Sequence, residues 1–432
     1  MIQKQVTFNL KQIVSFIVML VLLTYSFTAG GIKNYIFQSV AVVIAAFGVI
    51  LVGMFFVSSG RFAKRSLPII VLAFLCIAVI LINRNGNFSR GVYENDFVII
   101  ASFIFLVLAM NVKEWHMPFI FISVAWVLLH STVTILEYAI PGFYTSSILP
   151  LFKSAMYYND LIWVFSIGKI PGLAGHFSTN GIYLSVGLVI LSVCLMNRRN
   201  KRKLPLIILV VITAIALLLT GKRAVLIFGA VGIFIAYFCL NADKPGKRIV
   251  KIIGVVILIV LLFFIARTFI PALDNFINRF IETSERGDIT TGRGELNSVA
   301  VRFFAENPII GIGWDHYKYY YLAVYNKLLN AHNVFLQLLA ENGILGAAPF
   351  FGLFVLLYVR AIRALLRYVK TEAEKDPACT LALTLSISMQ TMFLLYCLTG
   401  NPLYDSQMLI PYLCSCAMGE YYILRINRKR EG

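Results

Sequence analysis

Residues 204–220 read LPLIILVVITAIALLLT and residues 224–240 read AVLIFGAVGIFIAYFCL, with only Gly221, Lys222 and Arg223 between them. As an α-helix, each run is about long enough to cross the roughly 30 Å hydrocarbon core of a bilayer. In lipid, backbone N–H and C=O groups must pair with each other, which a helix achieves within one segment. This stretch therefore predicts two membrane-spanning helices joined by a very short turn.

Similar apolar runs fill most of the chain. Of its 432 residues, 59% are apolar and 13% are charged, about half the charged fraction of a soluble domain. We expect a single all-α integral membrane domain over residues 1–432 with twelve transmembrane helices. Besides the two runs above, the predicted helices lie at approximately 12–29, 35–57, 67–83, 97–111, 118–136, 180–197, 249–270, 344–360, 379–399 and 408–424.

The net charge of +18 comes largely from short clusters between these runs. Lys and Arg in short loops normally mark the cytoplasmic side of a membrane protein. With twelve helices and cytoplasmic termini, all five clusters lie on one side, which favours a membrane protein over a nucleic-acid-binding one. The clusters fall within residues 61–65, 198–203, 244–251, 360–370 and 425–430. Seven cysteines without a Cys-x-x-Cys pair predict neither a disulfide framework nor a zinc site.

This topology places two long connections outside, at roughly 137–179 and 271–343. In the second connection, between the ninth and tenth helices, acidic and basic residues nearly balance, and Trp314 and several tyrosines suggest that it is folded. Apolar residues at helical spacing predict an amphipathic helix over 295–304 that could lie at the membrane interface, ending at Asn307-Pro308. They are Leu296, Val299, Ala300, Phe303 and Phe304, and Glu295, Ser298 and Arg302 form the opposite stripe.

Two outer features carry cations suited to phosphate. Lys222 and Arg223 occupy the turn of the hairpin, where Arg can bind phosphate oxygens with a bidentate fork. Arg293 stands between two glycines in TGRG (291–294), which let the backbone approach a ligand closely, and Arg302 follows it. The simpler alternatives are side chains that reach lipid headgroups and an ordinary solvated loop. Basic residues in a short outer turn run against the orientation rule, which favours function for the first pair.

The third feature is AHNVFLQLLAENGILG at 331–346, which predicts a helix re-entering the membrane with Asn333, Gln337 and Glu341 on one stripe and Gly343 as C-cap. A neutral His332 near its start could accept a proton from a sugar hydroxyl, or could simply bond loop groups. A weaker candidate is GHFSTN (175–180), with His176 and Asn180. For His130, Glu137 and His316 we favour structural roles. HExxH, P-loop, GxSxG and DxD patterns do not occur.

Taken together, these features resemble the O-antigen ligase and Wzy-type polymerase superfamily. Their order carries the resemblance: Gly175-His176 with Asn180, then Lys222-Arg223, then Gly292-Arg293. ENPIIGIGW (306–314) followed by HNVFLQ (332–337) and GILG (343–346) is the most specific part. One departure is that many members carry a Trp shortly after the loop Arg, where this chain has Leu296 and Asn297.

The resemblance implies transfer of a glycan from undecaprenyl diphosphate to an acceptor hydroxyl at the outer face of the bacterial cytoplasmic membrane. Arg223 and Arg293 would hold the diphosphate as it leaves, and His332 would orient or deprotonate the acceptor. No metal and no diffusible cofactor is expected, because the donor is already activated. The partners expected are the lipid-linked donor, a glycan acceptor, the bilayer and a chain-length regulator protein. Further candidates for substrate binding are Lys222, Arg302, His176, Asn180, Asn333, Glu341 and Trp314.

Three functions stay open at this point. A polymerase would use a second lipid-linked repeat unit as acceptor, and the HNVFLQLLAENGILG run looks most like polysaccharide polymerases of O-antigen, capsule or exopolysaccharide. A ligase would use lipid A-core or a protein. A lipid-linked oligosaccharide flippase is the more distant alternative, because transporters place polar residues at the bilayer midplane, whereas the candidates here cluster in outer loops.

Overall fold

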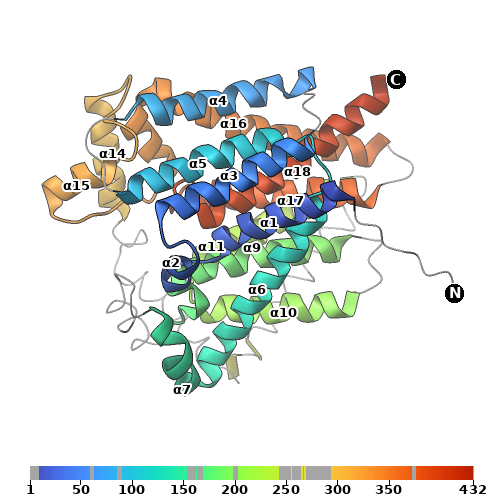
Figure 1. Cartoon of the computed structure of the whole chain (residues 1–432), viewed down its shortest axis with the longest axis horizontal. Helices are drawn as coiled ribbons and strands as arrows, with labels where there is room; N and C mark the ends of the chain where they lie inside the picture. Colours follow the sequence, from blue (N-terminus) through green and yellow to red (C-terminus); the bar gives the residue numbers. More distant parts are fainter. Residues whose placement is uncertain are drawn as a thin grey trace.

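The computed structural model describes residues 9–58, 63–84, 90–152, 169–197, 203–242, 293–371 and 376–431, with a few single positions between them. In this part of the chain every regular element is helical, which confirms the all-α fold (Figure 1). Long helices run side by side in both directions and form one bundle, because most of them are apolar and a helix satisfies its backbone hydrogen bonds within itself.

The long helices are α1 (Leu10–Phe27), α3 (Val40–Val57), α4 (Leu67–Ile82), α5 (Arg90–Ala109), α6 (His116–Ala139), α9 (Phe177–Met196), α10 (Lys203–Leu219), α11 (Arg223–Leu240), α16 (Val334–Thr371), α17 (Pro377–Tyr396) and α18 (Ser406–Glu431). The short helices are α2 (Gly30–Ile36), α7 (Pro141–Phe143), α14 (Arg293–Glu306) and α15 (Tyr317–Tyr325). Single turns lie at Lys64–Ser66, Tyr144–Ile148, Leu149–Phe152 and Gly172–Ala174. Every predicted run overlaps one of the long helices, except 249–270, which lies almost entirely outside the described residues, and the run 35–57 also includes the end of α2.

Among the described residues, eight helices are long and apolar enough to cross a membrane. These begin at Leu10, Val40, Lys64, His116, Phe177, Arg223, Val334 and Pro377, and the apolar helix Lys203–Leu219 is slightly shorter. The chain is thus a multi-pass membrane protein. The number of twelve and the placement of a large loop between the ninth and tenth helices stay predictions, because 271–292 also lies outside the described residues.

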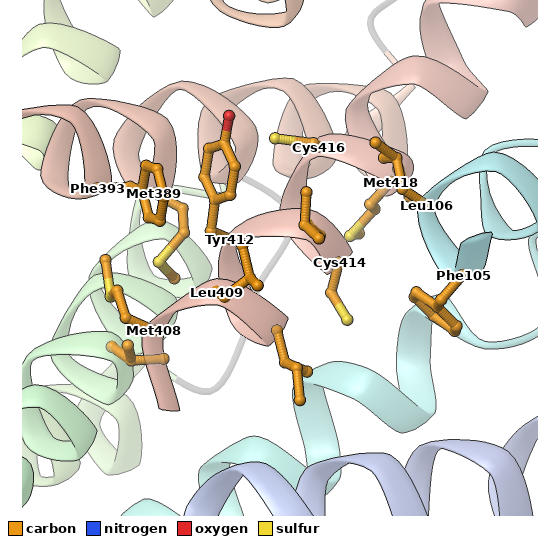
Figure 2. Close-up of a cluster of buried hydrophobic side chains, with 14 of the residues drawn as sticks. Phe105, Leu106, Met389, Phe393, Met408, Leu409, Tyr412, Cys414, Cys416 and Met418 are labelled. Carbon is orange, nitrogen blue, oxygen red and sulfur yellow. The ribbon is translucent and has the colours of Figure 1, made fainter. Parts of the chain in front are cut away.

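The helices differ in how much of their surface the bundle covers. The spans of α9 and α17 are each 72% buried, whereas those of α3 and α11 are 28% buried. Outer helices expose large apolar side chains, such as Val52 and Phe55 on α3. In water such a surface would be costly, but acyl chains solvate it. The interior at α17 and α18 is apolar and rich in sulfur and aromatic rings, with Phe393 and Tyr412 stacked 3.8 Å apart (Figure 2).

The two ends of the bundle differ in composition. α1 begins and α18 ends at one end, at the right of Figure 1, whereas α2, α7, α14 and α15 lie at the other, the site end. Described basic residues of the predicted clusters at 61–65, 360–370 and 425–430 lie at the first end, which we call the basic end. There Arg360 donates to the Arg65 carbonyl oxygen (3.3 Å), and Arg425 lies 3.7 Å from Asp376. This arrangement agrees with the prediction for the clusters at 61–65, 360–370 and 425–430, whereas residues 198–202 and 244–251 of the other two lie outside the described residues.

Both helices predicted in the large connection exist. The amphipathic helix is α14, which buries Leu296, Val299, Ala300 and Phe303 and ends at Glu306, directly before Asn307-Pro308. The predicted 331–346 helix forms the first part of α16. Gly343 lies where this first piece ends, with non-helical angles (φ +58°, ψ −168°), and a second helical piece follows it to Thr371.

Candidate active site

Two glycines bring the loop after α14 onto the break in α16. Gly311 and Gly343 have φ of +72° and +58°, a region that residues with a Cβ rarely adopt. A Cβ on Gly311 would lie 2.3 Å from the Glu341 carbonyl carbon, and one on Gly343 would lie 2.3 Å from the Ile309 carbonyl carbon. The ENPIIGIGW and AENGILG stretches are therefore two sides of one backbone contact.

Trp314 anchors this loop to the bundle. Its ring is fully buried, and its Nε1 donates to Asp96 on α5 (2.8 Å), which also pairs with Arg84 at 2.9 Å. The ring stacks on Phe350 and Tyr404 at centroid distances of 5.6 and 5.1 Å. Buried on all sides, Trp314 has an architectural role, and its predicted contact with substrate receives no support from this position.

His332 lies in the connection that leads into α16, with its backbone in the left-handed region (φ +53°). This conformation is costly for a side-chain-bearing residue and persists only where the surroundings fix it. Before the histidine, Ala331 N donates to Gln337 Oε1 (3.2 Å). After it, Val334 N donates to the Cys397 carbonyl oxygen at the end of α17 (2.8 Å). The imidazole therefore projects from a turn that is held on both flanks.

Lys222 and Arg293 bring positive charge close to His332. Lys222 is the N-cap residue of α11, and Arg293 is the first residue of α14. The stem of Lys222 packs on α9, where a Cβ on Gly181 would lie 2.7 Å from the Lys222 Cβ. Its Nζ lies 5.7 Å from the centroid of the Tyr396 ring. Two cations that are distant in sequence thus converge beside one histidine.

The proximity of these charges affects the pKa values of His332 and Lys222. Burial and then the positive charges of Arg293 and Lys222 lower the pKa of His332 to about 4. Burial and Arg293 lower the pKa of Lys222 to about 8, against the opposing effect of Asp405. At pH 7 His332 is therefore neutral, with a free lone pair, and Lys222 is still mostly protonated.

His176 also lies near Lys222. It is the N-cap of α9, where its Nδ1 accepts from Ser178 N (3.3 Å), and its ring lies 4.9 Å from Phe177. The ring is open at the surface, yet surrounding protein, Lys222 and Lys169 lower the pKa of His176 to about 4. Lys169 Nζ lies 4.4 Å from the centroid of the Phe177 ring. Lys169 thus adds a cation that the sequence reading did not include.

The candidate residues stand at the N-termini of four helices. His176, Lys222, Arg293 and His332 each lie within two residues of the start of α9, α11, α14 and α16, respectively. A helix N-terminus carries about half a positive charge and unpaired N–H groups, which favour anions. The electrostatic interactions above place these termini near one another. The site end therefore contains a region where Lys222, Arg293 and the helix dipoles favour negative charge.

The structure adds Asp405 and Tyr396, which the sequence reading missed. Burial raises the pKa of Asp405 to about 6, and Lys222 opposes this shift, so the carboxylate is mostly ionised at pH 7. Tyr396, at the end of α17, interacts electrostatically with both Asp405 and Arg293. The sequence feature that could have identified Asp405 is its position. It lies shortly before the last apolar run, on the predicted outer side.

Other predicted site residues serve the framework. Asn180 is fully buried and donates to Thr134 Oγ1 on α6 (2.8 Å). Asn333 caps α16, where its Oδ1 accepts from two backbone N–H groups at 3.1 and 3.2 Å. Glu341 is fully buried and accepts three hydrogen bonds, from Tyr404, Gln337 and the backbone N–H of Tyr317. These contacts within the framework account for the positions of the three side chains. Their contact with substrate stays a prediction.

The remaining two arginines differ in setting. Arg223 is the first residue of α11, directly after Lys222, and adds a further positive charge to that turn. Arg302 lies on the exposed face of α14, 3.9 Å from Glu306, with its side chain 49% exposed. Arg223 therefore belongs to the cation region by position, whereas Arg302 faces away from the buried face of its helix.

The histidines and acid for which we favoured structural roles have such contacts. His130 is buried, with Nε2 at 2.9 Å from the Phe27 carbonyl oxygen. Glu137 accepts from Gly172 N at 2.7 Å. His316 Nδ1 lies 2.9 Å from the Trp314 carbonyl oxygen. Each is explained by its local contacts, as expected.

Residues 208–351 match the family model described as O-antigen ligase. The match covers about a third of the chain and includes Lys222, Arg223, Arg293 and His332. It confirms the resemblance to the O-antigen ligase and Wzy-type superfamily and supports a ligase- or polymerase-like membrane glycosyltransferase function. A comparison with curated proteins finds no match.

Proposed function

We propose that this protein is a glycan polymerase that joins undecaprenyl-diphosphate-linked repeat units at the outer face of the bacterial cytoplasmic membrane. One observation carries the proposal. Lys222 and Arg293 lie beside a neutral His332 where four helix N-termini meet, within the segment that matches the O-antigen ligase family. The arrangement suits a substrate with a concentrated negative charge next to a hydroxyl that must lose a proton.

The cations suit the leaving group. As the bond between the anomeric carbon and the diphosphate oxygen breaks, negative charge grows on that oxygen. Lys222, Arg293 and Arg223 would hold the diphosphate, and fixed positive charges at the site of developing charge lower the barrier without reorganisation. Asp405 offsets part of this charge, so the free site does not carry the full repulsion among the cations.

His332 suits the acceptor. Its neutral imidazole would take the proton of the acceptor hydroxyl while that oxygen bonds to the anomeric carbon, and the lipid diphosphate would leave as an anion. The pKa of about 4 is low for a base in the free protein, and Arg293 and Lys222 contribute to lowering it. A bound diphosphate would offset these cations and raise the proton affinity of His332. One direct displacement would invert the anomeric centre.

The arrangement of charges suggests the orientation. The basic residues at the basic end would face the cytoplasm according to the positive-inside rule. Both termini would then be cytoplasmic, and His332 would lie on the outer side of the membrane. Lipid-linked donors would reach it from the outer leaflet after translocation.

Ligation is the second candidate function, because the matching family model is described as O-antigen ligase. The chemistry at the donor would be the same, and only the acceptor would differ. A ligase would take lipid A-core or a protein in place of a second lipid-linked repeat unit.

Deletion and complementation test these proposals. The deleted strain would receive wild type, Arg223→Ala, Arg293→Ala or His332→Ala, with Arg302→Ala and His316→Ala as matched controls from the same loop. Membrane levels of each variant would be measured, and glycan length read on gels. We expect single repeat units in the deletion and in the three site variants, and a full ladder with both controls.

Other outcomes point elsewhere. Long undecaprenyl-linked chains that accumulate unattached would identify a ligase with the same site. A full ladder with all three site variants would contradict the proposed site and favour a flippase, which has no need of His332. Loss of the ladder with Arg302→Ala or His316→Ala, at normal membrane levels, would show that the loop as a whole matters and that the cluster is not special.

A further inference from the structure

Three separate stretches of the site end meet at the carboxylate of Glu341. Its Oε1 accepts from Gln337 Nε2 (2.9 Å) and from the backbone N–H of Tyr317 (3.2 Å), and its Oε2 accepts from Tyr404 OH (2.6 Å). The side chain is completely buried. A buried carboxylate is retained only where donors satisfy it, so this contact fixes the relative positions of α15, α16 and the connection after α17.

One chain of hydrogen bonds leads from Glu341 through Gln337 to the residue before His332. Gln337 Nε2 donates to Glu341, so the amide is oriented with Oε1 toward the connection before α16. There Oε1 accepts from Ala331 N at 3.2 Å. The same Nε2 also donates to Asn330 Oδ1 at 3.2 Å. If the carboxylate were lost, the amide could rotate, and the N–H before His332 would lose its acceptor.

Because the backbone of His332 is left-handed, the link through Gln337 matters for the position of the imidazole. A residue with a Cβ at φ +53° relaxes toward more common angles unless its flanks hold it. Before the histidine, Gln337 holds the chain through its bonds with Ala331 N and Asn330 Oδ1, and after it Val334 N donates to the Cys397 carbonyl oxygen. Loss of the bonds with Gln337 would redirect the imidazole by changing the turn from which it projects.

A second chain of contacts leads from Glu341 through Tyr404 to Asp405. Tyr404 donates to Glu341 and stacks on Trp314, so its side chain is held at both its hydroxyl and its ring. Asp405 follows directly and interacts electrostatically with Lys222. Glu341 is thus linked through Gln337 to the turn that holds His332. Through Tyr404, the residue directly before Asp405, it is linked to the acid.

We propose that Glu341 is a positioning residue that sets the orientation of His332 through Gln337 and the place of Asp405 through Tyr404. This inference rests on the proposed function, since it assigns Glu341 a part in the same reaction without contact with the substrate. It replaces the substrate-binding role that the sequence suggested for Glu341.

The first test is a double-mutant cycle on the purified full-length enzyme, with a lipid-linked repeat unit as substrate and long incubations that register residual rates. We expect Glu341→Gln to lower kcat by about tenfold or more while KM for the donor changes by less than about twofold. In a His332→Ala background, the same change should lower kcat by clearly less than in the wild type, because the part of its effect that passes through Gln337 acts on the imidazole. Full additivity with His332→Ala would overturn the proposal.

Two companion variants separate positioning from general damage. Glu420→Gln weakens a buried ion pair with Arg360 on the same α16 helix, far from the site, and its effect should add to that of His332→Ala. The exchange Gln337→Glu/Glu341→Gln restores one carboxylate–amide hydrogen bond and an acceptor for Ala331 N. It should recover part of the kcat lost in Glu341→Gln, and no recovery would contradict the role of Gln337.

Amide hydrogen exchange gives a readout independent of activity. In Glu341→Gln, exchange should quicken in peptides that cover 330–334 and 401–405, and stay unchanged in those that cover 360–368. Unchanged exchange at 330–334 would overturn the proposal whatever the enzyme does. If His332→Ala polymerises glycan normally while exchange changes as expected, the proposed function fails and the framework role of Glu341 remains.

Discussion

Two groups of basic residues, one at each end of the bundle, have opposite surroundings. At the basic end, Arg360 donates two hydrogen bonds to Glu420 (2.9 and 2.8 Å), and Arg425 lies 3.7 Å from Asp376. At the site end, Lys222 and Arg293 lie close enough to each other that Arg293 helps to lower the pKa of Lys222. At the basic end a carboxylate pairs directly with each of these cations, whereas at the site end Lys222, Arg293 and His332 lie together and Asp405 offsets only part of the effect of the positive charge on Lys222.

This difference separates stabilising charge from charge held for a ligand. An ion pair with good hydrogen bonds offsets the cost of removing its members from water. Neighbouring cations do not stabilise each other in the free protein. Such a pair is typical of a site where an anion binds. The site end resembles the second case, and three measurements would break or sharpen the contrast.

The largest effect is expected for Arg293→Ala. Removal of one fixed positive group from the developing charge should lower kcat/KM for the donor by about 10²- to 10³-fold, as for other groups that stabilise a leaving or attacking oxygen. Arg302→Ala, on the exposed face of the same helix, should stay within about twofold, because its pair with Glu306 is solvent-exposed. Steady-state kinetics of the purified variants decide this. Equal losses in both would erase the distinction between the two arginines.

Next in size is the loss of the ion pair at the basic end. Arg360→Ala leaves Glu420, 2% exposed, without its partner, which should destabilise the protein by about 3 kcal/mol. The turnover of the folded fraction should not change, because the pair lies at the end opposite the site. Thermal unfolding in detergent measures the first effect, and kinetics at low temperature measure the second. Arg363→Ala, on an exposed position of α16, serves as the control and should not lower Tm appreciably.

The smallest effect concerns pH. Lys222 carries its charge below about pH 8 and loses it as pH rises, because burial and Arg293 lower its pKa to about 8. Diphosphate binds the charged form, so kcat/KM should fall about tenfold per pH unit above this value. Lys222→Arg should move this decline to higher pH, since Arg keeps its proton beyond about pH 12. A profile that does not change in Lys222→Arg would show that another group causes the decline.

Local sequence patterns determined much of the framework. Apolar runs of the right length predicted the helices, because a segment in lipid must satisfy its own backbone. Helical spacing predicted α14, and Asn307-Pro308 predicted its end. The predicted helices at 331–346 and 344–360 correspond to the two pieces of α16, which meet at Gly343, and His332 lies just before the first of them.

Which candidate residues meet was decided by tertiary structure. Lys222, Arg293 and His332 could be identified individually by type and position, but their proximity depends on how α11, α14 and α16 pack. The same packing brought Asp405 and Tyr396 to Lys222, and it buried Trp314, Asn180 and Glu341 within the framework. Helix formation depends on neighbours along the chain, whereas a charge cluster depends on contacts between distant segments, and no local pattern encodes those.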